Sequence, residues 1–115
     1  WCHANDHQLI YANDPPRLMY SVDHGHFFPG GPHWTIESLA NATSATLYQS
    51  IVSDCRLTSE EQIAAIQHLQ RLDEKAIVKS VATPPEEWNV SIEERVALVE
   101  FLIRRRNELL EIYAA

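Results

Sequence analysis

The sequence predicts a single, mainly α-helical domain of the α+β class, with a β-hairpin at its N-terminus. Three observations carry this prediction: two short apolar runs around a turn, all three glycines gathered in the segment that follows, and helical periodicity from Thr35 onward. The chain has 115 residues, 45% of them hydrophobic, which suits one hydrophobic core. We therefore expect one domain over residues 1–115: a β-hairpin over 1–23, a Gly/Pro-rich loop over 24–35 and a helical bundle over 36–115.

The predicted hairpin has two strands separated by a turn rich in proline. Residues 7–11 and 18–22 are strand-like runs, and Pro15-Pro16 favours a loop because proline fixes φ and donates no hydrogen bond. The expected register pairs His7 with Val22, Leu9 with Tyr20, and Tyr11 with Leu18.

The helical part is marked by side chains that cap helix starts. We expect short helices over about 36–40 and 44–55. Three further helices are predicted from their capping residues. One begins after Thr58 with Glu61 and runs to about Leu72, and one begins after Asp73 and runs to about Ala82, before Pro84-Pro85. The last begins after Ser91 with Glu94. In the last helix the apolar residues Val96, Val99 and Ile103 and their neighbours form a wide surface, which predicts a helix buried among others.

Charge and composition exclude several classes of function. The net charge of -7 argues against a duplex-binding protein, and no apolar run is long enough for a membrane helix. Cys2 and Cys55 are far apart, so we expect free thiols in a cytoplasmic protein. The basic run Arg104 to Arg106 is interpreted as a solvated helix end, with an anion site as the alternative. Because the chain starts at Trp1, we expect a fragment.

The residues most able to carry chemistry are Asp6 and Asp23. In the expected register they face one another at the open end of the hairpin, with Cα atoms ~4.5 to 5.5 Å apart. Facing carboxylates repel unless a cation or a shared proton lies between them, which suggests a Mg²⁺ or phosphate-handling centre. Aspartates at strand ends also commonly cap turns, so spacing alone leaves both interpretations open.

Histidines and aromatic residues gather in the same part of the chain. His24 and His26 could chelate zinc, but no second close pair completes a familiar ligand pattern, and ordinary hydrogen bonding is the alternative. Trp34 and Trp88 are expected to be packing anchors. The Phe27-Phe28 pair is expected to hold the glycine-rich loop on the helices.

The run from Tyr20 to Thr35, preceded by Asn5-Asp6-His7-Gln8, resembles a signature of bacterial HipA-like kinases. The later runs Pro84 to Trp88 and Glu94 to Leu98 agree with the C-terminal part of such proteins, so the resemblance covers most of the chain. It implies the helical C-lobe of a protein-kinase-like fold. It also implies that Asp6 is the catalytic aspartate, which orients or deprotonates the acceptor hydroxyl, and that Asp23 binds the Mg²⁺ that bridges to the ATP phosphates.

The chain departs from the family pattern at Tyr11, where the family has a metal-binding Asn. It also departs at Asn5, which is directly next to Asp6, whereas the family pattern has an Asn two residues before the catalytic Asp. It also has no phosphate loop or phosphate-pairing lysine of its own. The resemblance therefore implies ATP and Mg²⁺ as cofactors of a full-length parent, the missing N-terminal lobe as a partner, and a fragment inactive alone. The acceptor stays open, a homodimer is possible, and the alternative is a pseudokinase-type interaction or regulatory module.

Overall fold

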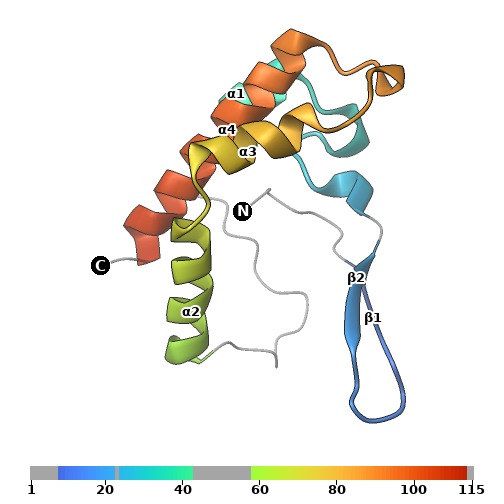
Figure 1. The fold of residues 1–115 in the computed structure, drawn as a ribbon, viewed down its shortest axis with the longest axis vertical. Helices are drawn as coiled ribbons and strands as arrows, with labels where there is room; N and C mark the ends of the chain where they lie inside the picture. The colour runs from blue at the N-terminus through green and yellow to red at the C-terminus, as the bar shows by residue number, and fades with distance from the viewer. Residues whose placement is uncertain (1–7, 23, 43–57, 114–115) are drawn as a thin grey trace.

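The structure, a computed structural model, describes residues 8–22, 24–42 and 58–113 (Figure 1). The described elements are, in order, β1 (Gln8–Tyr11), β2 (Met19–Val22), the 3-10 turns η1 (His24–His26) and η2 (Gly31–His33), α1 (Ile36–Asn41), α2 (Ser59–Gln70), α3 (Glu74–Ala82), the 3-10 turn η3 (Glu86–Trp88) and α4 (Ile92–Tyr113). The described part is mainly helical with one antiparallel two-stranded hairpin, which confirms the predicted α+β class.

Helix α4 organises the helical part, because α1, α2 and α3 each pack against it. Figure 1 shows α1 and α3 along one half of α4 and α2 near its C-terminal end. The core lies where α1, α3 and α4 meet, and its buried residues are Leu39, Ile77, Phe101 and Leu102. Fully burying one such side chain contributes about 1.5–3 kcal/mol. The hairpin extends away from this core (Figure 1).

The helix starts are set by local side-chain hydrogen bonds, as the sequence predicts. The Thr58 hydroxyl accepts from the Glu61 amide at 3.2 Å, and the Glu61 carboxylate accepts from the Thr58 amide at 2.7 Å. Asp73 accepts from the Ala76 amide at 2.7 Å at the start of α3. These side chains satisfy amides that a helix leaves without partners in its first turn.

The last and first helices use the same device. Ser91 and Glu94 form the predicted capping box of α4, at 3.1 and 2.8 Å. Helix α1 has a box that the sequence did not predict, between Thr35 and Ser38. The expected end of α3 is confirmed, α1 ends one residue later than expected and α2 two residues earlier. The helix expected over 44–55 lies outside the described residues.

The arginines of α4 correct the prediction of a solvated helix end. Arg105 is only 4% exposed, and the Arg104 guanidinium donates to the carbonyl oxygens of Leu39 at 2.6 Å and Ala40 at 3.2 Å, at the end of α1. Arg106 donates to the carbonyl of Leu72, between α2 and α3. The arginines therefore donate to carbonyl oxygens and pack in the interior, because helix C-termini leave carbonyl oxygens without partners.

One prediction of burial is wrong. Trp88, expected to be a packing anchor, is 68% exposed on η3. Helix α4 is buried among other helices, as predicted, because α1, α2 and α3 each pack against it, although Val96 on its apolar surface is 50% exposed. Trp34 does pack against the core, as predicted.

Candidate functional site

The register of the hairpin differs by one residue from the expected one. The observed pairs are Gln8 with Val22, Leu9 with Ser21, Ile10 with Tyr20, and Tyr11 with Met19. The predicted pairing of Leu9 with Tyr20 is therefore wrong. Because side chains alternate along a strand, a shift of one residue moves every side chain to the other face relative to its partner strand.

This register bears on the argument that joined Asp6 to Asp23. The expectation that Asp6 faces Asp23 depends on the expected pairs, which differ from the observed ones. Asp6 and Asp23 themselves lie outside the described residues. What the structure does describe is the chain on either side of Asp23: Val22 ends β2, and His24 begins η1.

The segment after Asp23 is a pair of tight turns with an unusual backbone. Gly30 has φ +94° and Gly31 has φ +57°, both in the left-handed region that glycine adopts without strain. At Gly31 a Cβ atom would lie 2.8 Å from Nδ1 of His26, so a side chain there would also collide with the imidazole. This explains two of the glycines that the sequence gathers in the loop.

The loop is tied to the helical core at two points. The Phe28 ring lies against the rings of Trp34 and Phe101, with centroids 6.3 and 6.2 Å apart. The Ser38 hydroxyl, in the first turn of α1, donates to the Pro29 carbonyl at 2.7 Å. The loop that follows Asp23 is thus held by one aromatic contact and one hydrogen bond to the elements behind it. Sequence reasoning anticipated Phe28 but missed Ser38, whose only signal was its place three residues after Thr35.

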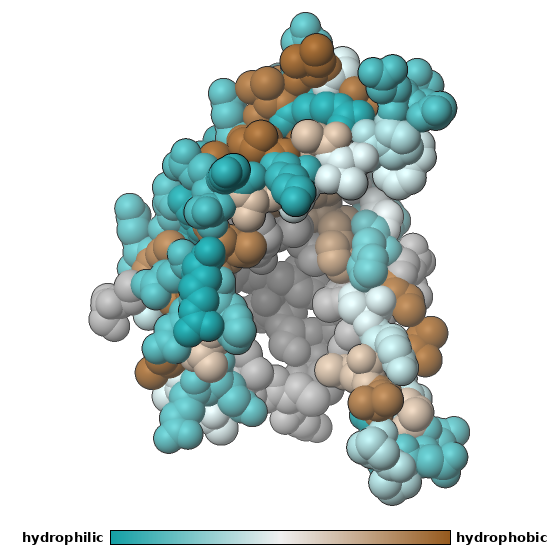
Figure 2. Space-filling view, viewed as in Figure 1, coloured by the Kyte–Doolittle hydropathy of each residue, from teal (hydrophilic) through white to brown (hydrophobic). Residues whose placement is uncertain are grey.

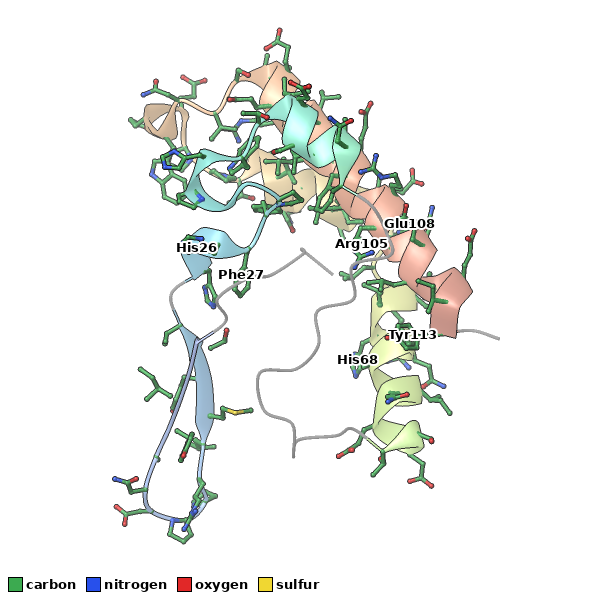
Figure 3. All side chains as sticks on the ribbon, turned by 180° about the vertical axis from the view of Figure 1, so that it is seen from behind. His26, Phe27, His68, Arg105, Glu108 and Tyr113 are labelled. Atoms are coloured by element: carbon green, nitrogen blue, oxygen red, sulfur yellow. The ribbon has the colours of Figure 1, made fainter. Side chains whose placement is uncertain are left out.

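Phe27 has a different role from Phe28. Its ring lies 4.5 Å from the His24 imidazole, and His24 in turn is within hydrogen-bonding distance of the Ser21 hydroxyl at 2.9 Å. Figure 3 shows Phe27 and His26 where the hairpin joins the loop. These contacts connect the end of β2 to η1, on either side of Asp23.

The loop histidines do not gather into a metal site within the described residues. His24, His26 and His33 are all exposed, and no group of three or more His, Cys, Asp or Glu side chains that could hold a metal ion occurs in the described ranges. His24 instead contacts Ser21 and Phe27, as the hydrogen-bonding alternative expects.

Tyr11, which stands where the resemblance implies a metal-binding Asn, lies at the turn end of β1. It is 62% exposed and pairs with Met19. The residue next to Asp23 is at the opposite end of the paired strands, so within the described hairpin Tyr11 is not near the chain that leads into η1. Figure 1 shows the full length of the ribbon between these two ends.

Comparisons with known proteins identify no relative. No family model, no curated protein and no solved structure matches the chain. Among the described helices, none combines the length and the apolar character that crossing a membrane requires.

Proposed function

We propose that this chain is the C-terminal, helical part of an ATP- and Mg²⁺-dependent phosphotransferase of the HipA-like kind. The observation that carries the proposal is the run from Tyr20 to Thr35 together with Asn5-Asp6-His7-Gln8. In this proposal Asp6 is the catalytic aspartate and Asp23 the metal-binding one. A helical C-lobe of a kinase-like fold is part of the same proposal.

The local structure around the motif supports a role that needs a fixed position. A metal-binding side chain acts only when the elements on both sides hold it in place. Val22 belongs to a paired strand, and the loop after His24 is tied to the core through Phe28 and Ser38. Asp23 stands between these two anchored segments in the sequence.

The donor chemistry fits magnesium. Mg²⁺ prefers hard oxygen ligands and usually takes one or two carboxylates together with the phosphates of the substrate. Mg²⁺ supplies charge neutralisation between the ATP phosphates, and Asp6 orients the acceptor hydroxyl or takes its proton. Tyr11 cannot replace the amide oxygen of an Asn, so Asp23 is the metal ligand on which the proposal depends.

The test is made on the longer protein that the proposal implies, because the phosphate loop and its lysine are not in this chain. Mg²⁺-dependent ATP binding is measured by calorimetry for the parent, Asp23→Asn and Asp14→Asn. Asp14 is an exposed acid in the hairpin turn, so its substitution makes the same change of charge at the other end of the hairpin.

We expect Asp23→Asn to remove the increase in ATP affinity that Mg²⁺ produces, and Asp14→Asn to keep it. Asp6→Asn should leave Mg²⁺-dependent ATP binding in place and stop phosphoryl transfer. Equal Mg²⁺-dependent binding in the parent and Asp23→Asn would remove Asp23 from the site.

A second candidate is a pseudokinase-type interaction module without catalysis. The hairpin favours it, since five large apolar side chains in and beside the two strands are each more than half exposed: Ile10, Tyr11, Leu18, Met19 and Tyr20. An isolated two-stranded hairpin is marginal in water, so such a surface is typical of one that packs on a partner. A parent protein that binds no nucleotide with or without Mg²⁺ would favour this module over the enzyme.

A further inference from the structure

Helices α3 and α4 form an apolar groove beside the shared core, against which two of its lining residues, Val81 and Val99, also pack. Its apolar lining residues are Val78, Val81, Ala82, Ile92, Val96 and Val99. Three of them are largely open to solvent: Val78 is 48% exposed, Val96 50% and Ile92 76%. Figure 2 shows brown, hydrophobic atoms over the end of the molecule where α3 runs beside the first turns of α4. Exposed apolar side chains that line one groove commonly mark a contact surface.

The two edges of this groove carry opposite charges. Lys75 and Lys79 are exposed and lie on α3 within one turn of Val78. Both are on the side of Val78 opposite the buried Ile77. Glu93 and Glu100 are exposed and flank Val96 on α4 at spacings of three and four residues. The groove therefore has a basic edge along α3 and an acidic edge along α4.

We propose that this groove is the contact face of a homodimer, in which α3 of each copy packs over α4 of the other. A two-fold axis lying parallel to the helices, between the two faces, produces this arrangement. It sets the basic edge of one copy against the acidic edge of its partner. A two-fold axis across the helices would instead set lysine edge on lysine edge, and like charges in contact oppose association.

The charges of the face explain why a second copy is a suitable occupant. Arg95 also lines the groove, so the face carries three cations against two carboxylates and adds nothing to the long-range repulsion between chains of net charge -7. Standard interfaces bury about 800 Å² on each partner, and six mostly small aliphatic side chains supply less than that. We therefore expect a weak dimer that forms at micromolar to millimolar concentration. The inference uses only residues of α3 and α4, so it does not rest on the proposed phosphotransferase.

The test is sedimentation equilibrium of the protein from about 5 to 500 µM, which covers the dissociation constants expected of a weak dimer. The mass should rise from one chain toward two. Ile92→Glu should weaken association at least about tenfold, because it places a charge in the apolar contact. The matched control is Ile63→Glu, an equivalent change at a 56% exposed position on α2. Far-UV circular dichroism checks that both variants remain folded.

Charge reversal tests the orientation. Lys79→Glu and Glu100→Lys should each weaken the dimer on the order of threefold to thirtyfold, since each symmetric dimer has two copies of the contact. The double variant should recover most of the loss. A mass of one chain throughout the range, or equal weakening by Ile63→Glu and Ile92→Glu, would overturn the proposal. A double variant weaker than both single variants would overturn the arrangement of α3 over α4.

Discussion

The guanidinium of Arg95, in the first turn of α4, donates to the carbonyl oxygen of Val81, in the last turn of α3, at 3.0 Å. The same side chain reaches the carbonyls of Ala82 at 3.3 Å, Pro84 at 2.8 Å and Val90 at 3.1 Å. One arginine thus serves the end of α3, the loop after it and the start of α4. Arginine suits this role because its planar group presents five donors and no acceptor.

Arg95→Met should destabilise the fold by about 3 kcal/mol, because it leaves several partly buried carbonyls without their charged donor. Arg95→Lys should recover only part of the loss, since an ammonium group cannot span the same carbonyls. Urea unfolding measures both, with Arg17→Met, at an exposed position in the hairpin turn, as the control. A stability of Arg95→Met equal to that of the control would contradict the capping role.

Gly31→Ala should cost about 1–2 kcal/mol from the left-handed backbone, plus the collision of the new Cβ with His26. Adding His26→Ala should restore the stability lost through the collision, while the stability lost through the left-handed backbone should remain lost. Thermal unfolding of the single and double variants separates the two contributions. If the double variant is no more stable than Gly31→Ala, the imidazole does not limit this position.

Phe28→Ala should destabilise the protein by about 2 kcal/mol, because it removes a half-buried ring from Phe101 and Trp34. Trp88→Ala removes a larger ring at a 68% exposed position and should change stability by less than about 0.5 kcal/mol. Chemical denaturation of the two variants compares them directly. A larger loss for Trp88→Ala would contradict the packing described for the loop.

The pKa of Glu61 is lowered from its ordinary value of 4.5 by hydrogen bonds from the Thr58 backbone amide and then the Thr58 hydroxyl. A carboxyl whose pKa is lower in the folded chain stabilises the fold above pH 4.5, and this contribution is lost as the pH falls through the lowered value. Glu61→Gln should therefore be less stable than the unchanged protein at pH 6, and the difference should shrink at pH values of about 3.

The control for this prediction is Glu60→Gln, which removes a carboxylate from the same turn of α2 without touching the capping box. Urea midpoints at the two pH values give the comparison. A difference between Glu61→Gln and the unchanged protein that persists at low pH would show that charge is not what Glu61 contributes.

The sequence alone determined the features that depend on neighbours along the chain. Thr58 with Glu61, Asp73 and Ser91 with Glu94 begin the helices where predicted, because each cap is a hydrogen bond between residues three apart. The two strands also appear where the pattern places them.

Only the tertiary structure decided the partners that come from distant segments. Arg104 meets the carbonyl of Leu39 across more than sixty residues, Trp88 stays in solvent, and the hairpin pairs one residue away from the expected register. None of these follows from local spacing, because a guanidinium or an indole can be satisfied by many partners, and a short hairpin with apolar side chains on both faces favours no single register. The packing of α1 on α4 around the common core is what brings Arg104 to the carbonyl of Leu39.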